Sequence, residues 1–173
     1  MTITITQLNE SGACLPQQVK FQEKFGDSVE VTAETARNAA LDFDFLWAAN
    51  NLLSEKSQKR FKALNKTAWD IFCNCTKSQS DKMWRTLSPA KQELDRVKDE
   101  SRAQYRQAIT RGEKADWASY ANNDYPAWRA YCKVWDFAIR VFNESTFEEK
   151  KTYLQTIALA FAEIYLTQEH IFS

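Results

Sequence analysis

The sequence contains little glycine, proline and histidine: 3 Gly, 3 Pro and 1 His among 173 residues. So few glycines and prolines argue against turn-rich sandwiches and barrels, and against loops that need glycine to bind phosphates or dinucleotides. Long apolar runs are also absent, since no stretch of 18 apolar residues occurs and no charged segment followed by an apolar one opens the chain. We therefore expect neither a membrane span nor a secretory signal, and we expect a cytoplasmic protein.

Residues suited to catalysis or metal binding are scarce and scattered. The single histidine, His170, lies near the end of the chain, and the spacing of Cys73 and Cys75 does not match the C-x2-C pairs of zinc sites. Three pairs of carboxylates each fit a helix start or an exposed helical face: Asp42 with Asp44, Asp99 with Glu100, and Glu148 with Glu149. The sequence thus predicts a non-enzymatic protein without cofactor or metal, whose four cysteines are reduced and mostly buried.

The composition is typical of one helical globular protein. Apolar residues make up 44% of the chain and aromatic residues 13%, which provides enough apolar surface for a core. Basic and acidic residues number 23 each but are unevenly distributed. Residues 1–55 hold 3 basic and 8 acidic residues, residues 56–114 hold 15 and 7, and residues 115–173 hold 5 and 8. The middle third is therefore basic, with a net charge of +8 between flanks of −5 and −3.

Residues 1–53 predict a series of short helices, each with a recognisable cap or stop. The first begins at Thr4 or Thr6 and stops at Gly12, and the second begins at Pro16 and stops at Gly26. Two more begin at the N-caps Thr32 and Asp42 or Asp44. The first residues alternate as a strand does, but we favour a short helix over residues 7–11. A brief extended piece is expected at residues 29–31.

Longer helices are expected after residue 53, because apolar residues there recur at steps of three and four. Their predicted starts are Ser54, the cap Ser88 with Pro89, Pro126, and overlapping capping boxes at Ser145 and Thr146. The first is expected to break at residues 78–80 and the second to end at Gly112. A short segment around Trp117 and Tyr120 precedes the third.

The N-terminal part of the chain carries one resemblance to known proteins. The residues concerned are Gly12-Ala13-Cys14, Gln17, Phe21, Phe25-Gly26, Val29-Glu30-Val31-Thr32 and Asp42-Phe43-Asp44-Phe45-Leu46-Trp47-Ala48. This stretch resembles a module of small uncharacterised α-helical accessory proteins of bacteriophages and prophages. Residues 94–97, 103–105 and 126–131 are similar to the alanine- and tyrosine-rich helical tails of such proteins. The resemblance implies an accessory role, in a class that includes inhibitors of host defence, and it implies no catalytic residues.

Aromatic residues off the main apolar stripes provide the first candidate for a binding site. They are Trp69, Trp84, Trp117, Tyr125 and Trp128. Exposed aromatic side chains are enriched at protein interfaces, which they anchor with little loss of entropy. The candidate patch consists of four residues that flank one predicted turn: Trp117, Tyr120, Tyr125 and Trp128. The alternative is that short helices bury these residues in a second small core.

Basic residues in 56–114 provide a second candidate. Lys98, Arg102 and Arg106 recur at four-residue steps and are expected on one helix face, where they suit phosphates, while interleaved aromatic residues suit bases. Acidic residues such as Asp95 and Asp99 interrupt the same helix. An ordinary solvated face is therefore the alternative, as is a face that meets the acidic flanks within the fold or across a dimer.

We conclude from the sequence that this is an all-α protein, in which a short-helix N-terminal module, residues 1–53, packs on an antiparallel helical bundle, residues 54–173. We expect it to bind a bacterial host protein or complex stoichiometrically in the host cytoplasm. Binding of nucleic acid through residues 56–114 is the alternative function, and a virion or assembly component is a third. The pattern is compatible with a homodimer.

Overall fold

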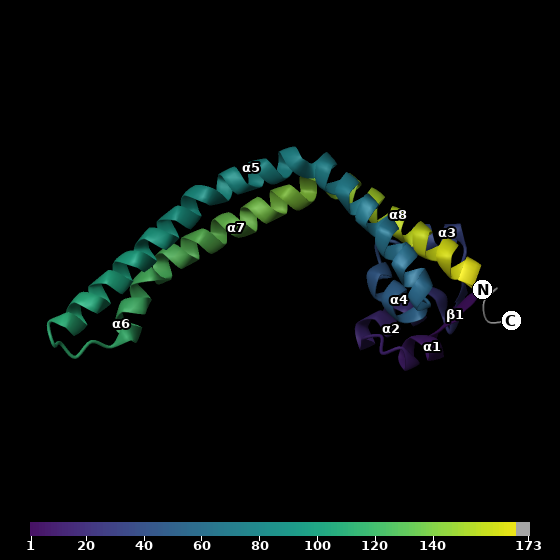
Figure 1. Ribbon diagram of the computed structural model, residues 1–173, viewed down its shortest axis with the longest axis horizontal. Coiled ribbons are helices and arrows are strands. Elements are labelled where there is room, and N and C mark those ends of the chain that lie inside the picture. Colours follow the sequence, from purple (N-terminus) through teal and green to yellow (C-terminus); the bar gives the residue numbers. More distant parts are fainter. Residues whose placement is uncertain (169–173) are drawn as a thin grey trace. The chain divides into compact units, whose positions relative to one another are not determined.

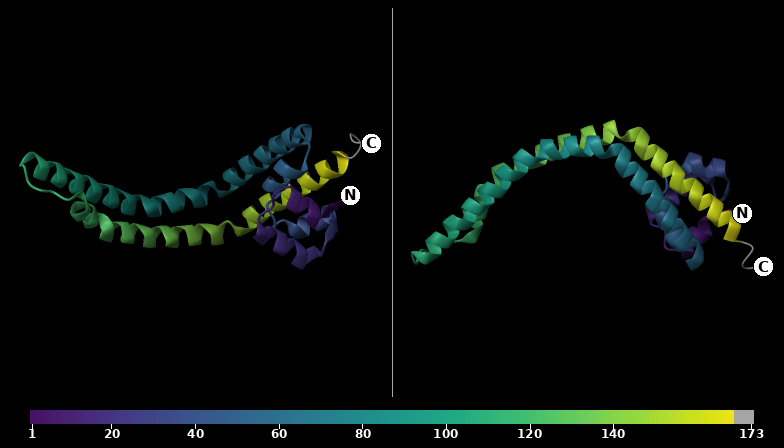
Figure 2. Two further views of the ribbon diagram at one scale, coloured as in Figure 1. Left: turned by 90° about the horizontal axis from the view of Figure 1, so that it is seen from below. Right: turned by 45° about the horizontal axis from the view of Figure 1, so that its top comes forward.

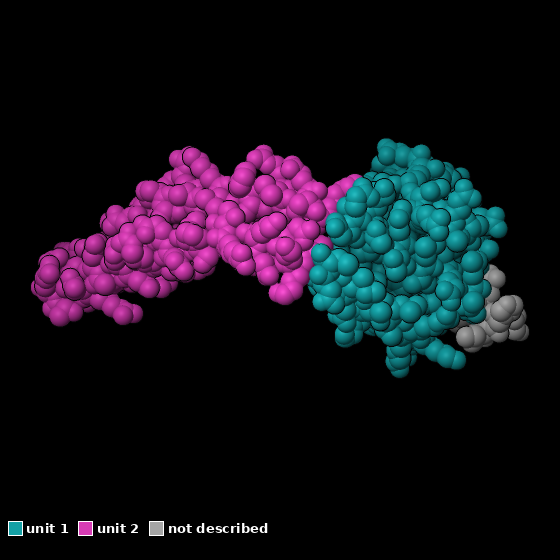
Figure 3. All heavy atoms as spheres, turned by 90° about the horizontal axis from the view of Figure 1, so that it is seen from above, with its two compact units in different colours: residues 1–75, 148–173 teal, residues 76–147 magenta. Residues whose placement is uncertain are grey.

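The computed structural model describes residues 1–168, which form an all-α protein with one small sheet (Figure 1). The chain divides into two compact units (Figure 3). Unit 1 contains residues 1–75 and the residues from 148 onward, and unit 2 contains residues 76–147. One long helix, α5 (Glu55–Thr110), begins in unit 1 and ends in unit 2.

Short elements form the N-terminal part of unit 1, as the caps and stops predict. They are β1 (Thr2–Thr4), α1 (Ile5–Glu10), α2 (Leu15–Phe25), β2 (Ser28–Glu30), α3 (Ala33–Ala39) and α4 (Phe45–Leu52). Thr32 forms a capping box with Thr35 at the start of α3, and the Asp44 carboxylate accepts hydrogen bonds from the first amides of α4. Gly26 ends α2 with a φ of +72°, a conformation that favours glycine.

The first residues combine the two alternatives that the sequence offers. Thr2–Thr4 form a strand that pairs antiparallel with β2, with Ile3 opposite Val29. Thr4 is also the cap of α1, because its hydroxyl accepts a hydrogen bond from the amide of Gln7. The predicted short helix therefore begins two residues earlier than expected, directly after the strand.

The core of unit 1 contains residues of the N-terminal elements, of α5 and of the last helix. It combines buried residues of the short elements, such as Phe21 and Phe45, with Phe61 of α5 and with the inward face of α8 (Phe147–Thr167). The sequence predicts an inward face of Leu154, Ile157, Phe161, Ile164 and Tyr165 on this helix. Leu154 is half-buried, and the other four are buried. The rings of Phe161 and Phe45 meet edge to face with their centroids 5.5 Å apart. The predicted division at residue 53 does not coincide with the units, because residues 1–53 share this core with α5 and α8.

Hydrogen bonds of Gln168, directly after α8, connect this helix to the residues between α4 and α5. The side chain of Gln168 accepts a hydrogen bond from the amide of Ser54 at 3.1 Å and donates one to the carbonyl of Leu52 at 3.2 Å. Gln168 is buried, and these bonds satisfy its amide group. They connect the end of α8 to the turn between α4 and α5.

Helix α5 is continuous where the sequence predicts two helices. Residues 78–80 lie inside it, and so does Pro89, which was expected to open a new helix. The hydroxyl of Ser88 accepts a hydrogen bond from the Gln92 side chain at 3.4 Å and does not cap a helix. Buried residues on both sides of Pro89 explain the continuity, and the buried residues of α5 are Ser57, Phe61, Ala68, Thr76, Leu87, Leu94, Ser101 and Ala108. We infer that burial of these residues outweighs the cost of the proline.

Unit 2 is a hairpin of two antiparallel helices. Its elements after α5 are α6 (Trp117–Ala121), the 3-10 turn η1 (Asn122–Asp124) and α7 (Tyr125–Ser145), which runs beside the second part of α5 (Figures 1 and 2). Buried residues of α5 recur every seven positions at Leu87, Leu94, Ser101 and Ala108, as in a coiled coil. Helix α7 contributes buried Ala138. Each helix thus buries one narrow stripe.

The junction between α7 and α8 lacks the predicted capping boxes. The hydroxyls of Ser145 and Thr146 both donate to the carbonyl of Phe142, at 3.0 and 2.8 Å. They therefore satisfy the end of α7 and not the start of α8. Ser145 still belongs to α7, and Thr146 is a fully buried C-cap.

The expected burial of the cysteines is wrong. Cys14, Cys73 and Cys75 are exposed, Cys132 is half-buried, and all four are free thiols. Cys73 and Cys75 are exposed because the inward stripe of α5 passes through Phe72 and Thr76 instead. His170 lies outside the described residues.

Replacing Phe161 with alanine tests the core of unit 1. Phe161 is almost fully buried, so Phe161→Ala is expected to lower the free energy of unfolding by about 3–5 kcal/mol. Phe137→Ala is the matched control, because Phe137 is 53% exposed and its loss is expected to change stability by about 0.5 kcal/mol or less. Urea unfolding of both variants measures the difference. Equal effects would contradict the packing of α8 described above.

Two substitutions test the continuity of α5. Because proline costs about 3 kcal/mol relative to alanine inside a helix, Pro89→Ala is expected to raise the free energy of unfolding by up to this amount. Ser88→Ala is expected to change it by about 0.5 kcal/mol or less. If Ser88 were a cap, its loss would instead destabilise the protein by about 1 kcal/mol. Urea denaturation decides between a continuous helix and one that starts at Ser88.

Candidate functional site

Unit 2 carries a row of aromatic rings in mutual contact, which we call the aromatic strip. Its members are Trp84 on α5 and Trp128, Tyr131 and Trp135 on α7. Ring centroids lie 6.5 Å apart between Trp84 and Trp135, 6.0 Å between Trp135 and Tyr131, and 6.1 Å between Tyr131 and Trp128. Trp84 is 55% exposed and Trp128 is 45% exposed, while the other two are half-buried. The strip thus crosses both helices and ends in exposed indoles.

The spacing of residues on α7 explains how the strip forms. Trp128, Tyr131 and Trp135 follow one another at steps of three and four, so they share one side of the helix. This side borders the stripe that α7 buries against α5, which brings Trp135 to Trp84. At the other end, the ammonium group of Lys98 on α5 lies 5.7 Å from the ring centroid of Trp128. A cation over an indole face is held there by the charge distribution of the ring.

Among the described residues, no chain of ring contacts joins all four predicted patch residues. Trp117 and Tyr120 pack edge to face on Tyr105 of α5, with centroid distances of 5.2 and 5.7 Å. Tyr125 contacts the guanidinium of Arg129, at 5.9 Å from its ring centroid, and Trp128 belongs to the aromatic strip. Packing on Tyr105 partly matches the alternative of a second small core. The predicted exposure is nevertheless confirmed for Trp117, Tyr125 and Trp128.

Sequence reasoning missed Tyr131 and Trp135 as site residues. The signal is the spacing of Trp128, Tyr131 and Trp135 at steps of three and four, which places the three rings on one side of a helix. Trp84 was recognised as an exposed aromatic residue, yet only the pairing of α5 with α7 places it beside Trp135.

The basic residues of α5 are compensated in part. All seven acidic residues of 56–114 form ion pairs: Asp70, Asp81, Glu93, Asp95, Asp99, Glu100 and Glu113. Arg96 bridges Glu93 and Glu100, which raises its own pKa, while the hydrogen bond from Arg96 lowers the pKa of Glu93. These pairs are exposed and add little stability.

The three predicted basic residues lie in three different environments. Lys98 covers the ring of Trp128, and Arg102 pairs with Asp99 at 3.3 Å. Arg106 is exposed and has no carboxylate within 4 Å among residues 1–168. Of the three, only Lys98 contacts the aromatic strip.

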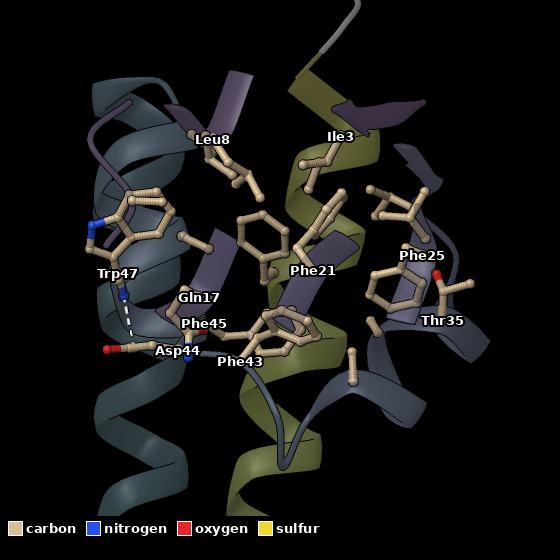
Figure 4. A pocket seen from close by; sticks show the side chains of 18 residues that line it. Ile3, Leu8, Gln17, Phe21, Phe25, Thr35, Phe43, Asp44, Phe45 and Trp47 are labelled. Atoms are coloured by element: carbon tan, nitrogen blue, oxygen red, sulfur yellow. Dashed lines mark hydrogen bonds between the residues drawn. The ribbon is translucent and has the colours of Figure 1, made fainter. Parts of the chain in front are cut away.

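Unit 1 contains a small apolar cavity of about 90 Å³ (Figure 4). Its wall includes Phe21, Phe25, Phe43, Phe45 and Phe161. Pockets that bind small molecules measure about 300–1,000 Å³ and place a few polar groups to orient the ligand. Two of the polar residues in this wall are engaged, because the hydroxyl of Thr35 donates to a carbonyl and the carboxylate of Asp44 caps α4. We interpret the cavity as a packing void.

A second hollow lies between α5 and α8 in unit 1, with a volume of about 340 Å³. Its hydroxyl groups are engaged, because Thr152 and Thr156 donate to carbonyls one turn earlier and Tyr153 donates to Asn65 at 2.8 Å. Burial raises the pKa of Tyr153. This groove therefore presents no free hydroxyl suited to catalysis.

Within residues 1–168, no three His, Cys, Asp or Glu side chains are arranged to hold a metal ion. No helix there is long and apolar enough to cross a membrane. We therefore take the aromatic strip, with its connected rings and two exposed indoles, as the candidate binding surface.

Comparison of the chain with protein-family models, with curated proteins and with solved structures found no match. The function proposed below therefore rests on the geometry of the aromatic strip and on the resemblance noted in the sequence.

Proposed function

We propose that this protein is a non-enzymatic phage or prophage accessory protein, which binds and modulates a bacterial host protein or complex in the host cytoplasm, as a defence-system inhibitor does. The observation that carries this proposal is the aromatic strip of unit 2, with two indoles about half exposed. The resemblance of residues 12–53 to accessory proteins supplies the bacterial context.

The physical properties of the strip favour a protein partner. Indole and phenol rings bury a large area on binding and lose little conformational entropy, which is why tryptophan and tyrosine dominate the energetics of protein interfaces. The rings of Tyr131 and Trp135 are half-buried and support the exposed rings of Trp84 and Trp128. A surface organised in this way before binding requires little ordering when a partner docks.

Binding of nucleic acid is the second candidate function. The observation that favours it is the position of Lys98 over Trp128, because single-stranded nucleic acid is bound by cations next to stacking aromatic rings. Arg106 offers a further charge for phosphate. Against it stand the ion pairs of Lys91 with Asp95 and of Arg102 with Asp99, which compensate two of the cations along the same helix. We therefore favour a protein partner.

A double substitution in the strip tests the proposed function. The variant Trp84→Ala with Trp128→Ala is expected to lose the host protein that the tagged wild-type chain retains from bacterial lysate after nuclease treatment. Truncating an interface anchor weakens affinity about 30-fold or more. Titration of the purified host protein against both chains then measures the loss.

Trp69→Ala is the matched control, because Trp69 is 48% exposed but lies in unit 1. It is expected to bind like the wild type. Equal retention by the double variant and the wild type, with circular dichroism unchanged, would contradict the role of the strip. Turnover of a substrate by sub-stoichiometric amounts of the protein would contradict a non-enzymatic function.

A further inference from the structure

We propose that the aromatic strip recognises an acidic segment of its protein partner, with the strip as anchor and the cations of α5 as the source of charge specificity. This inference rests on the proposed function and names the chemistry of the partner. The structural basis is the continuity between rings and cations on unit 2.

Helix α5 places a cation beside one end of the strip and others further along the helix. Trp84, Lys91 and Lys98 are seven residues apart, so they lie along one side of the helix. Lys98 contacts Trp128 directly, with its ammonium 5.7 Å from the ring centroid. Arg102 follows Lys98 by four residues and continues the row toward Arg106. A partner seated on the rings therefore meets Lys98 at the same time.

The charge around the strip remains positive after the internal ion pairs are formed. The exposed side chains of Lys82 and Arg85, which are close to Trp84 in sequence, have no carboxylate within 4 Å among the described residues, and the same holds for Arg106. The carboxylates of α5 in unit 2 are all held by neighbouring cations. Complementary charge therefore means carboxylates on the partner.

Helix α7 does not reverse this charge. Its charged residues next to the strip in sequence are Arg129, Lys133 and Asp136, which together add one positive charge. Arg129 lies against the ring of Tyr125, 5.9 Å from its centroid.

The distribution of these cations fits carboxylates on a protein better than a phosphate backbone. A nucleic acid needs an extended track of positive charge along its phosphates. Here the cations alternate with carboxylates such as Asp95 and Asp99, so the free cations are isolated. A single cation next to an aromatic anchor, as Lys98 is to Trp128, is suited to a single carboxylate, with which it forms a charge-assisted hydrogen bond. We therefore assign an acidic protein segment as the occupant.

Charge reversal in the full-length chain tests this assignment. The probes are a fluorescein-labelled peptide of Glu, Leu and Trp, the same peptide with Gln at every Glu, and a labelled single-stranded oligothymidylate. Fluorescence anisotropy of the wild-type chain is expected to detect the Glu peptide and to show at least tenfold weaker binding of the Gln peptide. Arg102→Glu with Arg106→Glu is expected to weaken binding of the Glu peptide about tenfold or more.

The matched control reverses two cations of unit 1, Lys59→Glu with Lys62→Glu, and is expected to bind the Glu peptide within about twofold of the wild type, because these cations do not belong to the unit that carries the strip. The milder variant Arg106→Gln, which only removes charge from an exposed position, is expected to weaken binding in the same direction. Circular dichroism of each variant checks that the helices are retained.

Three results would overturn the inference. They are equal binding of the Glu and Gln peptides, equal weakening by the unit 1 control, and tighter binding of oligothymidylate than of the Glu peptide. The proposed function is separable from it. If the Trp84 and Trp128 double variant loses the host protein while the Arg102 and Arg106 reversal retains it, the strip is an interface but its partner is not recognised through acidic groups. If both variants retain the host protein, both proposals fail.

Discussion

The burial of α8 against the N-terminal third of the chain is the constraint on which the rest of the structure depends. Ile157, Phe161 and Ile164 fill a core that the short elements β1 to α4 surround but do not complete by themselves. Because Phe61 of α5 belongs to the same core, the chain leaves unit 1 along α5 and must return to it along α8. Unit 2 is the connection between these two helices. The side chains of unit 2 therefore do not belong to the core of unit 1, and their main packing constraint is the pairing of α5 with α7.

The helices α5 and α7 bury only a narrow stripe each, and this explains why aromatic side chains in unit 2 are exposed. A hairpin of two helices buries one stripe on each, and on α5 this stripe passes through residues as small as Ser101 and Ala108. Large side chains off the stripe stay partly exposed, since no third helix covers them within unit 2. Trp84 and Trp128 lie in such positions, and each gains support from a ring on the opposite helix or one turn away. Their exposure follows from the architecture, whereas their mutual contact gives the surface its organisation.

Local signals predicted the short elements well because each depends on neighbouring residues. Thr32, Asp44 and Gly26 act within one turn of their own position, and the inward face of α8 follows from a period of three and four. The same kind of signal failed at Pro89, where burial of α5 residues on both sides of the proline outweighs a local preference for a helix start. It failed again at Ser145 and Thr146, whose hydroxyls bind backward to Phe142. For the site, exposure of Trp84 and Trp128 was predictable from their place off the stripe, but their connection through Trp135 and Tyr131 depends on the register of two distant helices.

The charge of the middle third acquires a different meaning once the ion pairs are known. As a total, +8 over residues 56–114 is as compatible with phosphate binding as with a solvated helix. With every acidic residue of that segment held by a cation, the surface near the strip presents separated positive groups and not a continuous track. Separated cations supply little affinity by themselves, because exposed charges are well solvated. Next to aromatic anchors that exclude water they contribute more, because an ion pair is stronger where the surrounding dielectric is low. Specificity for carboxylates therefore requires the rings and the cations together, and in the aromatic strip Lys98 and Trp128 provide that combination.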